Sequence, residues 1–125
     1  MRMYFLSGVF AALLGFLGCA GQTLDDAAKS QHAKYILVAA LDAWKAGHVE
    51  SLAARTPSIR FADHDQRAGM ELVDYEFENE AAQIRPFQNV RIVLSLRDKQ
   101  GQTNEKTVTY QVGVEPALTV LRSDN

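Results

Sequence analysis

The fold is decided by 90-VRIVLSLRDKQGQTNEKTVTYQVGV-114, two segments of alternating hydrophobicity joined by a polar loop. In the first segment every second residue is aliphatic: Val90, Ile92, Leu94 and Leu96. In the second segment the apolar phase holds Val108, Tyr110, Val112 and Val114. Alternation with a period of two is typical of a half-buried strand, and the glycine in the loop can adopt the positive φ that tight turns require. The stretch therefore predicts an antiparallel hairpin with one apolar and one polar face.

The same alternation predicts three further strands, at 70-MELVDYEFENE-80, 117-ALTVLR-122 and around 58-SIRFA-62. In the first of these, Val73, Tyr75 and Phe77 are expected on the apolar face, opposite a row of carboxylates. Together with the hairpin, these segments predict a curled antiparallel sheet of roughly four to five strands with one solvated face.

A long helix is expected before the sheet, at 23-TLDDAAKSQHAKYILVAALDAWKAGH-48. Thr23 is a good N-cap residue, and Gly47 is a natural place for the helix to end. One face of this helix is apolar, with Ala33, Leu37, Ala40, Leu41 and Trp44. A short helical turn at 48-HVESLAAR-55 is expected to follow. The chain is therefore predicted to be α+β, with one domain at 23–125 in which the helix packs on the sheet.

The order of these elements resembles the cystatin-like and NTF2-like folds, in which a long helix lies in the concavity of such a sheet. The segments 44-WKAG-47, 67-RAGMELVDYE-76, 104-NEKTVTYQVG-113 and 116-PALTVLR-122 resemble small uncharacterised bacterial lipoproteins with this layout. No activity comes with that resemblance.

The N-terminus resembles a signal peptide. Arg2 is followed by 4-YFLSGVFAALLGFLG-18, which has no charged residue. This apolar run is shorter than the roughly 20 residues that a spanning helix needs. A positive start, a short apolar run and small residues at its end are typical of a secretory signal peptide, here 1–18.

The only cysteine of the chain, Cys19, comes directly after this predicted signal peptide. The pattern Phe16-Leu17-Gly18-Cys19 resembles the lipobox of bacterial lipoproteins, in which a diacylglycerol is attached to the cysteine thiol and the cysteine becomes the new N-terminus. The resemblance implies lipidation at Cys19, a short tether at 19–22, and a membrane-anchored lipoprotein on the periplasmic side of a bacterial cell envelope. An unmodified cysteine is the alternative.

Composition excludes several classes of function. The chain has 13 Lys+Arg and 15 Asp+Glu, and no clustered basic face, which argues against a nucleic-acid partner. A single cysteine cannot form an internal disulfide. The sequence has no catalytic serine elbow, zinc-protease motif or phosphate-binding glycine loop. We therefore expect no enzyme and no cofactor.

Three local clusters could carry chemistry. In 63-DHDQR-67, the acidic residues and His64 could bind a divalent metal, although capping of a helix by Asp63 or Asp65 is the simpler interpretation. Four carboxylates share one strand face: Asp74, Glu76, Glu78 and Glu80. They predict either a solvated ladder paired with Arg91 and Arg97, or a weak electrostatic docking surface.

The third cluster is a possible ligand cavity between helix and sheet, with Trp44 and Tyr110 as its candidate residues. Packing of the helix on the sheet is the simpler role for Trp44, and Tyr110 is the only polar residue among those expected to face inward. The sequence thus favours a noncatalytic binding or assembly module that is lipid-anchored and has an envelope protein as its possible partner. The alternative is an NTF2-like small-ligand carrier or enzyme that uses the helix–sheet cavity.

Overall fold

The computed structural model describes residues 17–80, 84–86 and 88–124, with side chains from Asp26 onward. Most of the predicted signal peptide 1–18 and the side chain of Cys19 therefore lie outside the described residues. The predictions of export and of lipidation stay predictions.

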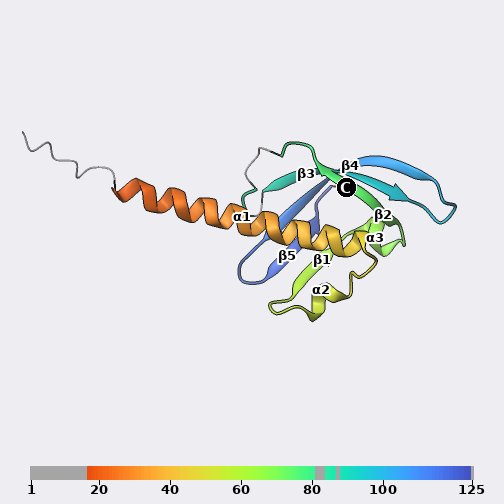
Figure 1. Ribbon diagram of the computed structural model, residues 1–125, viewed down its shortest axis with the longest axis horizontal. Coiled ribbons are helices and arrows are strands. Elements are labelled where there is room, and N and C mark those ends of the chain that lie inside the picture. The colour runs from red at the N-terminus through yellow and green to blue at the C-terminus, as the bar shows by residue number, and fades with distance from the viewer. Residues whose placement is uncertain (1–16, 81–83, 87, 125) are drawn as a thin grey trace, which may run out of the picture.

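The long helix α1 (Leu17–Lys45) lies across one face of the sheet, and its first turns project beyond that sheet (Figure 1). It begins earlier than predicted, so Thr23 lies inside the helix rather than at its N-cap. From Asp26 to His32 the side chains are exposed or half-buried, and Ala33 is the first buried one. The buried stripe that follows contains Ile36, Leu37, Ala40, Leu41 and Trp44. Beyond the helix, Gly47 has a φ of 77°, as a residue that ends a helix with a left-handed turn requires.

The sheet has five strands: β1 (Ile59–Ala62), β2 (Glu71–Phe77), β3 (Asn89–Arg97), β4 (Thr103–Gly113) and β5 (Leu118–Arg122). Their order is β1-β5-β4-β3-β2. Two one-turn helices flank β1, namely α2 (Ser51–Ala54) before it and α3 (His64–Arg67) after it.

The prediction of an entirely antiparallel sheet was wrong at one pair. Strands β2, β3, β4 and β5 are joined by antiparallel pairs, but β5 pairs in parallel with β1, from Ile59 opposite Leu118 to Ala62 opposite Leu121. The reason lies in the connections. The last strand, β5, follows β4 after a short connection and pairs with it in the antiparallel sense, and β1 lies on its other side in the same direction as β5.

The predicted hairpin is confirmed as β3 and β4. Ile92, Leu94 and Val108 have no solvent exposure, and they form the core together with the buried stripe of α1. The alternate residues of both strands are exposed or half-buried, apart from Gly113 at the end of β4. The apolar phase in the sequence therefore identified the face that α1 covers.

A β-bulge in β2 changed which of its residues reach the core. Leu72 lies opposite Leu96, and Asp74 lies opposite Ser95, so Val73 is an extra residue between them. An extra residue moves the following side chains to the other phase of the strand. Leu72, at 3% exposure, therefore shares the inner face with Tyr75 and Phe77, and the prediction that Val73 lies in this set was wrong.

Candidate functional site

A buried carboxylate, Asp63, lies where β1 meets α3. Its side chain has no solvent exposure. The Oδ1 atom accepts hydrogen bonds from the backbone N–H groups of Asp65, at 2.8 Å, and Gln66, at 3.1 Å. These bonds satisfy donors that the first turn of a helix leaves without partners. The predicted capping role is thus confirmed for Asp63, and among the described residues no three His, Cys, Asp or Glu side chains are placed to hold a metal ion.

The other oxygen of this carboxylate faces two buried donors from the sheet. Asp63 Oδ2 accepts a short hydrogen bond from the Tyr110 hydroxyl and another from Arg122 Nη1 at 3.1 Å. The register explains this meeting. Tyr110 lies opposite Arg122 in the β4–β5 pair, and continuing the parallel β1–β5 register beyond Ala62 brings Asp63 beside Arg122. Burial, together with the charge of Asp63, raises the pKa of Tyr110 far above its ordinary value.

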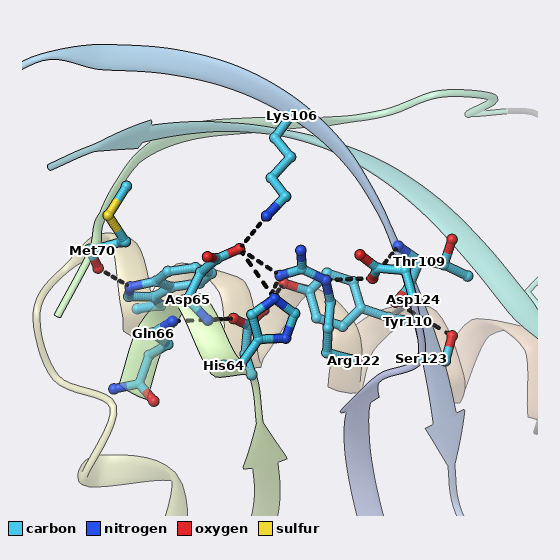
Figure 2. Close-up of polar contacts among 12 residues, drawn as sticks. His64, Asp65, Gln66, Met70, Lys106, Thr109, Tyr110, Arg122, Ser123 and Asp124 are labelled. Carbon is cyan, nitrogen blue, oxygen red and sulfur yellow. Dashed lines mark hydrogen bonds and ion pairs between the residues drawn. The ribbon is translucent and has the colours of Figure 1, made fainter. Parts of the chain in front are cut away.

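Arg122 is the centre of this group of side chains (Figure 2). Its side chain is only 2% exposed, and Nη1 also contacts Asp65 Oδ2 at 3.0 Å, while Nε donates to Asp124. Lys106 Nζ reaches the same Asp65 oxygen at 3.1 Å. We call Asp63, Asp65, Lys106, Tyr110, Arg122 and Asp124 the polar cluster. Burial alone would lower the pKa of Arg122, but its carboxylate partners raise it instead, so the guanidinium stays charged.

The polar cluster predicts acid sensitivity. Burial opposes the charged form of both Asp65 and Asp124 and would raise their pKa values. Hydrogen bonds from Lys106 and Arg122 nevertheless bring the pKa of Asp65 below the ordinary 3.8. A hydrogen bond from Arg122 does the same for the pKa of Asp124. A carboxyl group with a lowered pKa in the folded state contributes stability above its unfolded pKa and loses it as the pH falls through the folded value. We expect the free energy of unfolding, measured with urea, to fall steeply below pH 3.8. This drop should be smaller in Asp65→Asn, and an unchanged drop would contradict the assignment.

The two candidate cavity residues lie on either side of Phe61. The Phe61 ring is 5.9 Å from the ring of Trp44 and 6.3 Å from that of Tyr110, measured between centroids. Trp44 is 5% exposed, and its Nε1 donates to the Met70 carbonyl at 2.9 Å. Tyr110 belongs to the polar cluster. Both side chains are thus packed and hydrogen-bonded within the protein, although Trp44 also borders a surface hollow described below.

The predicted row of four carboxylates on one strand is only partly confirmed, because β2 ends at Phe77 and both Glu78 and Glu80 lie beyond it. Arg91 contacts Glu78 at 2.8 Å, as predicted, whereas Arg97 contacts Glu71, which was not in the predicted row, at 3.5 Å. Asp74 instead pairs with Lys45 of α1, at 3.2 Å, which the sequence did not indicate. Glu76 and Glu80 make no ion pair with any described residue.

Two hollows lie along β2, one at the end of α1 and one beside its last three turns. The first has a volume of about 620 Å³ and lies between the α1–α2 turn and the start of β2, with Trp44, Val49, Met70 and Leu72 among its apolar residues. The second, of about 370 Å³, is bounded by α1 residues Lys34, Asp42 and Lys45 and by residues 74–77 and Glu80. Lys45 borders both hollows. We call the pair the β2 groove.

Comparison with protein-family models, with curated proteins and with solved structures finds no match for this chain. The likeness to cystatin-like and NTF2-like folds and to bacterial lipoproteins therefore stays a prediction from the sequence. Within the part of the chain that the structure describes, no helix is both long and apolar enough to span a membrane.

Proposed function

We propose that this protein is a lipid-anchored, noncatalytic binding module on the periplasmic side of a bacterial cell envelope. The anchor would be a diacylglyceryl group on Cys19, supported by the lipobox-like pattern that ends the apolar run. A diacylglyceryl cysteine with a further acyl group supplies more than one lipid chain, which stable anchoring requires.

The observation that carries the proposal is the projection of α1 from the domain (Figure 1). Cys19 lies in the first turns of this helix, and among the side chains described from Asp26 onward Ala33 is the first buried one. At 1.5 Å per residue, the helix between these two positions is about 21 Å long. A helix of this length would hold the sheet away from the lipid surface, where another protein could reach it. Such a stalk would replace the short tether expected from the sequence.

The polar cluster also fits a noncatalytic role. Its carboxylates are held by Arg122 and Lys106, and Asp63 is fully buried. Acid–base catalysis needs a group that can reach substrate and exchange a proton near the working pH. Hydrogen-bonded ion pairs in the interior instead fix neighbouring elements relative to one another, here α3, β4 and β5.

The small-ligand carrier is the second candidate, and the hollow beside Trp44 is the observation that favours it. Its site would lie at the end of α1 rather than between helix and sheet. Tyr110 would take no part, because its hydroxyl is bound to Asp63 inside the protein.

The anchor is tested by the intact mass of the protein extracted from membranes of a bacterium that carries out lipoprotein processing. We expect the wild type to start at Cys19 and to carry the mass of its acyl chains, and Cys19→Ser to lack that mass. Ala20→Ser is the matched control, because it changes the neighbouring residue and leaves the thiol in place. A wild-type mass without acyl groups would contradict the proposal.

A further inference from the structure

We propose that the free edge of β2 binds an extended segment of a partner protein, one in which lysine or arginine alternates with apolar residues, and that this segment adds to the sheet as a further strand. The inference rests on the proposed function as a binding module and names the surface and the chemistry of the partner.

The backbone of β2 has an unpaired side. In the sheet formed by the described residues, β2 is an end strand, and β3 is the strand that pairs with it. Just past β2, the Glu78 N–H donates to the Arg91 carbonyl at 3.1 Å. Because facing residues of an antiparallel pair alternate between bonded and non-bonded positions, the backbone groups of Tyr75 and Phe77 point away from β3. Asp74 accepts a bond from the Tyr75 N–H, which leaves the Tyr75 carbonyl and both Phe77 groups for an added strand.

The space beside this edge is open. The β2 groove follows the strand, with the larger hollow next to residues 70–73 and the smaller one next to residues 74–77. An added strand would lie about 4.8 Å from β2, beside the hollow that separates residues 74–77 from Lys34, Asp42 and Lys45 of α1. Open edges are the sites where proteins accept an extra strand, unless the edge is covered or blocked by charge.

The charge on this edge selects the partner. Asp42, Asp74, Glu76 and Glu80 border the smaller hollow, and the cations beside them are Lys34 and Lys45. Lys45 is paired with Asp74, and Lys34 Nζ lies 5.2 Å from the centre of the Phe77 ring. Glu76 and Glu80 are thus exposed carboxylates without a cation. They repel an acidic strand and attract a basic one, because opposite charges on neighbouring strands stabilise the pair.

The two faces of β2 set the pattern of the added segment. Tyr75 and Phe77 face the core side, whereas Glu76 lies on the solvent side opposite Val93. Side chains of neighbouring strands at facing positions share a face. A segment with apolar residues toward α1 and basic residues toward Glu76 therefore matches both faces.

The first test uses a blocked heptapeptide in which lysine alternates with valine, followed by backbone amide NMR of the isotope-labelled domain. We expect saturable binding with the largest shift at the amide of Phe77, whose N–H is left for the added strand. The same peptide with N-methyl groups on its bonding edge should not bind, because it cannot complete the backbone hydrogen bonds. Glu76→Lys should weaken binding by about fivefold or more, since a favourable cross-strand pair becomes a repulsive one.

The matched control is Glu105→Lys. Glu105 is exposed, faces Ser95 and lies on β4, away from the free edge, so the same change in net charge should leave the affinity unchanged. The proposal is overturned if no binding occurs, if the N-methylated peptide binds equally well, or if Glu105→Lys weakens binding as much as Glu76→Lys does. Shifts of the β2 amides with protein concentration alone would also overturn it, because a second copy would then occupy the edge.

The second test separates this inference from the proposed function. A photo-crosslinking residue is placed at Glu76 or at Glu105 in cells that carry Cys19 or Cys19→Ser. Crosslinks to one protein from Glu76, but not from Glu105, in the Cys19 background support both statements. Crosslinks only from Glu105 would contradict binding at the β2 edge but would agree with a binding module. Crosslinks from neither position would contradict both statements.

Discussion

Replacing Arg122 with methionine is expected to lower the free energy of unfolding by about 3–5 kcal/mol, which is the range for removing one partner of a buried ion pair. Arg122 contacts Asp63 at 3.1 Å, and neither side chain is exposed by more than 2%. Without the guanidinium, Asp63 would stay buried with its charge opposed only by hydrogen bonds. Urea unfolding followed by circular dichroism measures the loss.

Two variants make this prediction specific. Arg91→Met also removes an arginine from an ion pair, but its side chain is 63% exposed, so we expect a loss of about 0–1 kcal/mol. The double variant Asp63→Asn/Arg122→Met removes both charges and should recover part of the loss, because no fully buried carboxylate is left without a cation. If Arg122→Met costs no more than Arg91→Met, the polar cluster does not stabilise the fold.

Replacing Trp44 with alanine is expected to cost about 3–5 kcal/mol, the range for deleting a large buried aromatic side chain. The indole fills the space between the end of α1 and Phe61, and its N–H satisfies the Met70 carbonyl. Urea unfolding followed by circular dichroism gives the loss. Trp44→Phe should cost less, because a ring remains at this position.

Tyr35 provides the matched control on the same helix. It is 60% exposed, so Tyr35→Ala should change stability far less than Trp44→Ala, despite the loss of a hydrogen bond with Arg55. If Trp44→Ala leaves stability intact, the indole does not hold the helix on the sheet, and a role in ligand binding at the neighbouring hollow becomes the better interpretation.

The elements of the fold could be predicted because their signals are local. The alternation of 90–97 and 106–114 identified the hairpin, and the apolar stripe ending at Trp44 identified the helix. The bulge at Val73 has no such signal, because it arises from the pairing of β2 with β3. The parallel pairing of β1 with β5 is equally non-local, since the two short strands lie far apart in the sequence.

The polar cluster was half visible in the sequence. The sequence indicated Asp63 as a helix cap or metal ligand. It did not indicate its partner Arg122, because Arg122 ends a short strand next to exposed residues. The signal that could have identified Arg122 was its position in the alternation of β5. Arg122 lies two residues after Val120, on the buried face of β5, and an arginine there requires a carboxylate nearby. Which carboxylate it meets depends on the register of β1, and sequence alone does not give that register.

The position of β5 has a consequence for the order of folding. Strands β2, β3 and β4 follow one another as a meander and can pair as soon as they are available, whereas β1 has no neighbour in the sheet until β5 arrives between it and β4. The proposed export moves the chain across a membrane with its N-terminal part first. Until β5 has crossed, the meander would therefore have two unpaired edge strands, β2 and β4. The pairing of β5 with β1 brings Arg122 beside Asp63, so the strand that joins β1 to the sheet also supplies the cation for its buried carboxylate.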